Sequence, residues 1–164
     1  MNKTINIIRS RNLNLVFVAV ILLAVGLGCS GNFSVGKPEM PSTDAQNSLV
    51  KGTLKEFTKG VKDENFSSLN QSASEEFKKQ VGADKIKTAF QPMIDKKDAV
   101  LPILESADSM TPQFTGTPAI QEEGGGYSLT LPGSFATDPA KTNFNFKYIW
   151  QDSQWKLLTV EVRM

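Results

Sequence analysis

The sequence predicts an α+β fold in which helices pack on a curved antiparallel sheet. Apolar residues recur at helical spacing as far as Met93, and after Pro112 they alternate with polar residues, as in half-buried strands. The N-terminal residues have a different composition and stand apart from this domain. We therefore expect a signal peptide at residues 1–28, a tether at 29–43 and a single cone-like domain at 44–164.

The first segment has the pattern of an export signal. Lys3, Arg9 and Arg11 precede an apolar run of 14 residues that ends at Gly28. Signal peptides carry about 7–15 apolar residues, whereas a membrane-spanning helix needs about 20. The run therefore predicts export, with the positive charges kept on the cytoplasmic side.

The stretch from Val25 to Cys29 (VGLGC) resembles a bacterial lipobox, although its leucine lies two rather than three residues before the cysteine. Cys29 is the only cysteine, and acylation would remove a free thiol from an oxidising compartment. The resemblance implies a protein anchored to the cell envelope by lipid on Cys29. It also implies the outer membrane, if the cell has one, because Ser30 rather than Asp follows. An ordinary cleaved signal and an uncleaved anchor helix are the alternatives.

Charge argues against nucleic acid as a partner. Three of the 18 basic residues and none of the 17 acidic residues precede Cys29, which leaves the mature chain with a net charge of −2. Nucleic-acid binding requires clustered positive charge. The pairs Lys78-Lys79 and Lys96-Lys97 fit solvated helix faces.

Residues 30–43 are rich in Gly, Ser and Pro, as is typical of a flexible tether. The first helix is expected to begin after a cap at Ser42, Thr43 or Asp44. Its apolar residues form one stripe: Val50, Leu54, Phe57 and Val61.

A second helical segment carries apolar residues at similar spacing, and Ser72 with Glu75 matches a capping box that would restart the helix. A third segment, from Asp84, is kinked or ended by Pro92. The apolar residues of these two segments are core candidates: Phe66, Leu69, Ala73, Phe77, Ile86, Ala89, Phe90 and Met93.

Two alternating runs then predict antiparallel strands, one beginning at Tyr127 and one at Asn143. The glycines at 124–126 fit the turn before the first of these strands. They do not form a phosphate loop, because no Lys-Ser/Thr pair and no helix follows them.

The domain resembles the nuclear transport factor 2-like superfamily of cystatin-like cones. The resemblance covers about 120 residues and rests on the first helix with Leu54 and Phe57, on KYIW at 147–150 and on WKLL at 155–158. It implies helices on a cone-shaped sheet and is closest to small bacterial lipoproteins of that group without assigned activity. The superfamily includes isomerases, dehydratases and binding domains, so the fold does not select a function.

The side chains argue against most catalytic chemistry. The chain has no histidine, which removes the commonest general base near neutral pH and the commonest metal ligand. With Cys29 assigned to the anchor and no calcium-loop spacing among the carboxylates, we expect neither a metal nor a cofactor.

Glu161 is the one acid–base candidate, and its position depends on strand register. If Trp150 pairs with Trp155, Phe144 faces Glu161, which then lies inside the cone with a raised pKa and could act as an acid or base. If Trp150 pairs with Gln154, Glu161 points to solvent. A slip of one residue exchanges the two faces. We expect the second register, because it makes the more apolar core.

Four aromatic side chains are candidates for lining the mouth of an apolar cone, although side chains of this kind more often fill the core or cover the end of the sheet: Tyr127, Tyr148, Trp150 and Trp155. We therefore expect a non-catalytic envelope lipoprotein that binds a small apolar ligand or another envelope protein. The alternative is a histidine-free isomerase or hydro-lyase that uses Glu161 or a tyrosine.

Overall fold

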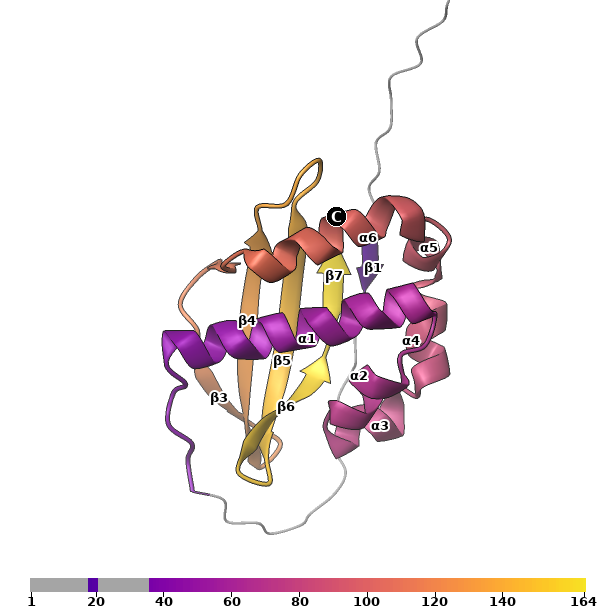
Figure 1. The fold of residues 1–164 in the computed structure, drawn as a ribbon. Helices are drawn as coiled ribbons and strands as arrows, with labels where there is room; N and C mark the ends of the chain where they lie inside the picture. Colours follow the sequence, from indigo (N-terminus) through magenta and orange to yellow (C-terminus); the bar gives the residue numbers. More distant parts are fainter. Residues whose placement is uncertain (1–17, 21–35) are drawn as a thin grey trace, which may run out of the picture.

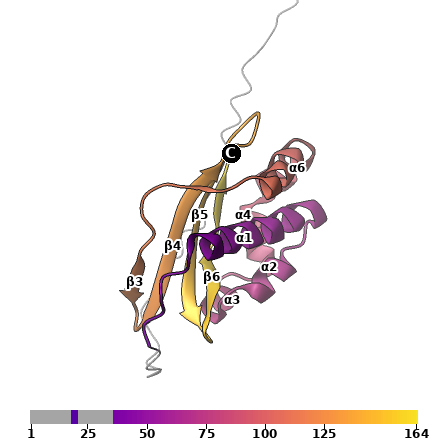
Figure 2. The ribbon, with the colours of Figure 1, turned by 60° about the vertical axis from the view of Figure 1, so that its left-hand side comes forward.

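The computed structural model describes residues 18–20 and 36–164 of the chain. Helices cover one face of an open antiparallel sheet, which confirms the α+β class (Figure 1). The turned view shows the helices and the sheet as separate layers (Figure 2). The predicted cleavage site, Cys29 and the first part of the tether lie outside the described residues.

The helical layer consists of six α-helices and one 3-10 helix within the described residues: α1 (Thr43–Asp63), α2 (Ser67–Ser72), α3 (Glu75–Gln80), α4 (Ala83–Ala89), α5 (Gln91–Ile94), α6 (Lys97–Ser106) and η1 (Ala107–Ser109). Ser42 caps α1, as predicted, by accepting a hydrogen bond on Oγ from the Ala45 amide at 3.2 Å. The predicted apolar stripe of α1 is buried.

The second helical segment is interrupted, as expected, but the residue that restarts it is Ser74 rather than Ser72. The Ser74 hydroxyl accepts a hydrogen bond from the Phe77 amide at 3.1 Å. The Ser74 amide donates to the Leu157 carbonyl at 2.9 Å. Ser74 therefore both caps α3 and attaches it to the sheet.

Helix α4 ends before Pro92, which lies in the first turn of α5. Helix α6 was not predicted, although Val100, Ile103, Leu104 and Ala107 have helical spacing and are buried. Pro102 inside α6 weakens the sequence signal, and packing against α1 compensates for it.

The sheet contains β1 (Val18–Val20), β2 (Gln113–Phe114), β3 (Ile120–Glu123), β4 (Gly126–Phe135), β5 (Thr142–Gln151), β6 (Gln154–Thr159) and β7 (Glu161–Arg163). The strand order is β1-β7-β5-β4-β2, with β3 beside β4 and β6 beside β5. The glycine turn joins β3 to β4 as predicted, with φ of 61° at Gly124 and 81° at Gly125. Strand β1 belongs to the predicted signal peptide and pairs with β7. Cleavage before Cys29 would therefore remove β1 and leave that edge of β7 without this partner.

A β-bulge between β5 and β6 produces a register that neither expectation contains. Trp150 pairs with Trp155, so the expected register, with Gln154 opposite Trp150, is wrong. The pairing then shifts by one residue, and Phe144 lies opposite Val162. The extra residue in the bulged strand keeps the tryptophans paired and also turns Val162 toward the core.

The core lies between α1 and the inner face of β4 and β5. Phe57, Phe66 and Phe90 contact one another, with ring centroids 4.7–6.1 Å apart. Leu131 and Phe146 pair across adjacent strands, belong to the same hydrophobic core and are fully buried. The inner face beneath α1 is therefore filled by side chains of the protein itself.

Candidate functional site

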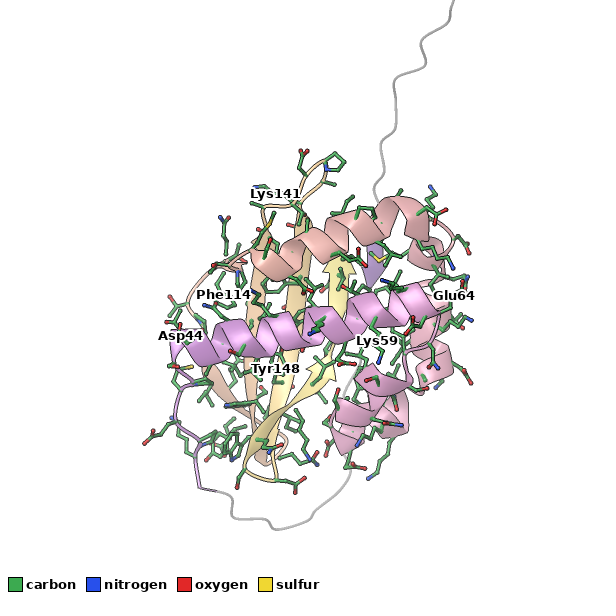
Figure 3. All side chains as sticks on the ribbon, viewed as in Figure 1. Asp44, Lys59, Glu64, Phe114, Lys141 and Tyr148 are labelled. Carbon is green, nitrogen blue, oxygen red and sulfur yellow. The ribbon has the colours of Figure 1, made fainter. Side chains whose placement is uncertain are left out.

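Tyr148 belongs to the core and does not line an opening. Its side chain lies against α1 near the middle of the sheet (Figure 3). The Tyr148 hydroxyl donates a hydrogen bond to the Leu49 carbonyl at 3.1 Å and accepts one from the Thr53 hydroxyl, with an oxygen–oxygen distance of 2.9 Å. Burial raises the pKa of Tyr148 well above its ordinary value of 10.0, because the phenolate would lose its hydration. Tyr148 is therefore a neutral group that holds α1 on the sheet.

The other three aromatic candidates form a row across neighbouring strands. Trp150 on β5 pairs with Trp155 on β6, and their ring centroids are 5.2 Å apart. Tyr127 on β4 lies one step beyond the Ser128–Ile149 pair, which places it opposite Trp150. Strand alternation puts all three side chains on the face that carries Tyr148. We call Tyr127, Trp150 and Trp155 the aromatic row.

The aromatic row lies at one end of the sheet, where the helices no longer cover it completely. Both views show the β5–β6 hairpin extending beyond α1 (Figures 1 and 2). All three side chains are partly exposed, in contrast to the buried Tyr148 one step further along β5. Sequence alternation put Tyr127 and Trp150 on the apolar faces of their strands, but the expected register put Trp155 on the face opposite Trp150. The observed pairing of Trp150 with Trp155 brings the three together, and the position of α1 decides that they remain accessible.

Glu161 lies on the opposite face of the sheet from Phe144, so the interior position considered for it is wrong. Its Oε2 accepts a hydrogen bond from Asn145 Nδ2 at 3.3 Å, and its Oε1 forms an ion pair with Arg163. Only 12% of the Glu161 side chain is exposed, so it does not point freely into solvent either. Together with Asn143, these side chains line a shallow depression on the outer face of the sheet.

A second polar depression, which the sequence did not indicate, lies at the C-terminal end of α1, where Figure 3 labels Glu64. Glu64 caps the helix with φ of 54° and contacts Lys97 Nζ at 2.6 Å and Lys87 Nζ at 3.8 Å. The hydrogen bond and charge of Lys97 lower the pKa of the Glu64 carboxyl. Because three lysines and three carboxylates line the depression, it has no net charge to attract an ionic ligand. We assign a structural role to this depression, in which its ion pairs connect the end of α1 to α4 and α6.

Among the described residues, no cluster of His, Cys, Asp and Glu side chains has the arrangement needed to hold a metal ion. No helix in the same part of the chain is both long and apolar enough to cross a membrane.

No protein-family model matches the chain, and no curated protein matches it either.

Proposed function

We propose that this chain is an exported, lipid-anchored envelope protein whose folded domain is a non-catalytic interaction module. The aromatic row is its contact surface. The partly exposed row of Tyr127, Trp150 and Trp155 is the observation that carries this proposal. Exposed tryptophan and tyrosine are typical of contact surfaces, because each offers a large apolar area with a polar tip.

The packing of the inner face favours interaction over enclosure of a ligand. Leu129, Leu131, Phe146 and Tyr148 fill the surface on which a cone-fold protein would hold a small molecule. Tyr148 has both hydroxyl contacts taken by α1, and Glu161 is on the other face. The isomerase alternative would require a reactive group on the inner face, where Glu161 is absent and Tyr148 is buried, so only Tyr127, at the end of the sheet, is left for it.

Photo-crosslinking in intact cells tests the contact surface. A photoreactive amino acid replaces Tyr127 in one variant and Lys141, in the loop at the opposite end of the sheet, in a matched control (Figure 3). We expect adducts from position 127 and few from position 141. Equal yields from the two positions would contradict the proposal.

Mass spectrometry of the protein purified from its own membranes tests the anchor. We expect a chain that begins at acylated Cys29. A chain that still carries Met1 would contradict the anchored form. A small molecule that is released only on denaturation would show that the domain binds a ligand.

A further inference from the structure

The described segment that leads into α1 begins near the aromatic row. Both views show this segment starting at the end of the sheet that carries the β3–β4 turn and the β5–β6 hairpin (Figures 1 and 2), and its first residue is Gly36. The segment that leads from Gly36 to α1 contains Met40, which has 43% of its surface exposed. The point of attachment to the predicted anchor and the aromatic row thus share one end of the domain.

The length of the tether restricts how the domain can face its membrane. Cys29 and Gly36 are separated by seven residue steps, which reach at most about 25 Å when fully extended. Strand β5 has 10 residues and spans about 33 Å. If Cys29 is acylated, an inverted domain with its Lys141 end on the bilayer would hold Gly36 farther from the membrane than the tether reaches. The aromatic row is therefore kept near the bilayer.

The chemistry of this end suits the membrane interface. Tryptophan and tyrosine concentrate at the headgroup level of bilayers, where the ring is in contact with apolar chains and the polar tip with water. Two of the acidic groups of the hairpins are paired with lysines on the same sheet, Glu123 with Lys147 and Asp152 with Lys156, whereas Glu122, opposite Tyr127, is exposed. Pairing these charges lowers the cost of bringing the hairpin ends to a lipid surface.

We propose that the aromatic row docks in the headgroup region of the membrane that carries the lipid anchor. This inference rests on the proposed function, because it names the bilayer as the partner of the same contact surface. Docking makes Trp150, Trp155 and Tyr127 a second membrane attachment beside the lipid on Cys29. The outer face of the sheet, which carries Asn145 and Glu161, takes no part in this docking.

Tryptophan fluorescence tests the docking directly, since Trp150 and Trp155 are the only tryptophans of the chain. The acylated protein is reconstituted into vesicles of phosphatidylethanolamine and phosphatidylglycerol, with or without bromine on the acyl chains. We expect brominated lipid to quench the emission and the emission maximum to shift to shorter wavelength relative to the protein in detergent. Bromine close to the headgroup should quench more than bromine at the chain end.

The matched control carries Trp150→Phe and Trp155→Phe together with Lys141→Trp, which moves the fluorophore to the opposite end of the sheet. We expect this control to be quenched much less than the wild type. If neither bromine position quenches the wild-type tryptophans, docking is refuted, whether or not the control variant folds. Crosslinks from position 127 to a protein, without quenching, would refute docking but leave the interaction module intact. Loss of both signals would refute both proposals.

Discussion

Replacing Tyr148 by phenylalanine should destabilise the domain, although no hydrocarbon is removed from the core. The hydroxyl bridges the Leu49 carbonyl and the Thr53 hydroxyl of α1, at 3.1 and 2.9 Å. Each such bond contributes about 0.5–1.5 kcal/mol, so Tyr148→Phe should cost about 2 kcal/mol. For a domain of this size, that lowers the melting temperature by roughly 6–10 °C.

The same substitution should change how stability depends on alkaline pH. Burial raises the pKa of Tyr148 in the folded protein above its ordinary value of 10.0. The stabilisation that the neutral Tyr148 side chain gives the folded protein is therefore complete below pH 10. It is lost as the pH rises further, because this tyrosine ionises first in the unfolded chain. The wild type should lose about 1.4 kcal/mol relative to Tyr148→Phe for each pH unit above 10, until the folded tyrosine itself ionises.

Urea denaturation followed by circular dichroism, at neutral pH and at pH 11, measures both effects. Tyr127→Phe is the matched control, because Tyr127 is partly exposed and the only other tyrosine. We expect that control to stay within about 0.5 kcal/mol of the wild type at neutral pH. If Tyr148→Phe matches the wild type at both pH values, the hydroxyl does not hold α1 on the sheet and our reasoning is wrong.

Four further substitutions test individual parts of the fold. Gly133→Ala should lower the free energy of unfolding by about 1–3 kcal/mol, since the new Cβ would lie 2.5 Å from a backbone oxygen of β2. At Gly52 a Cβ meets no neighbour, so Gly52→Ala should stabilise α1 by about 0.5–1 kcal/mol. Ser74→Ala should cost about 1 kcal/mol through loss of the α3 cap. The charged Glu64 carboxylate, paired with Lys97, stabilises the folded protein above the ordinary glutamate pKa of 4.5, and the wild type loses this stabilisation as the pH falls. Glu64→Gln lacks it at every pH, so the stabilities of the two proteins should converge in acid. Chemical denaturation at several pH values measures all of these effects.

Each of these tests has a clear opposing result. Equal effects of the two glycine substitutions would show that the close approach of β2 to β4 is not tight. An unchanged Ser74→Ala protein would mean that the cap is supplied by another group. A constant difference between Glu64→Gln and wild type from neutral to acid pH would show that the Lys97 pair does not respond to protonation.

Local chemistry made several elements predictable from the sequence. The cap at Ser42, the glycine turn before β4 and the alternation along β5 each depend on residues close together in the chain. The α+β class follows from the change of apolar period along the chain. For the same reason the sequence identified the face that Tyr127 and Trp150 share, although it did not show which aromatic side chains would be covered.

Contacts between distant residues decided the rest. The bulge in β6 moves Glu161 away from Phe144, and strand alternation alone could not place that extra residue. Helix α1 crosses the sheet at Tyr148 and leaves Trp150 and Trp155 beyond its edge, so residues of one alternating pattern become core in one case and surface in the other. The sequence by itself determined which side chains are apolar and at what period they recur, because these are local properties. Only the tertiary structure decided which of them reach solvent, because burial depends on elements that lie far apart in the chain.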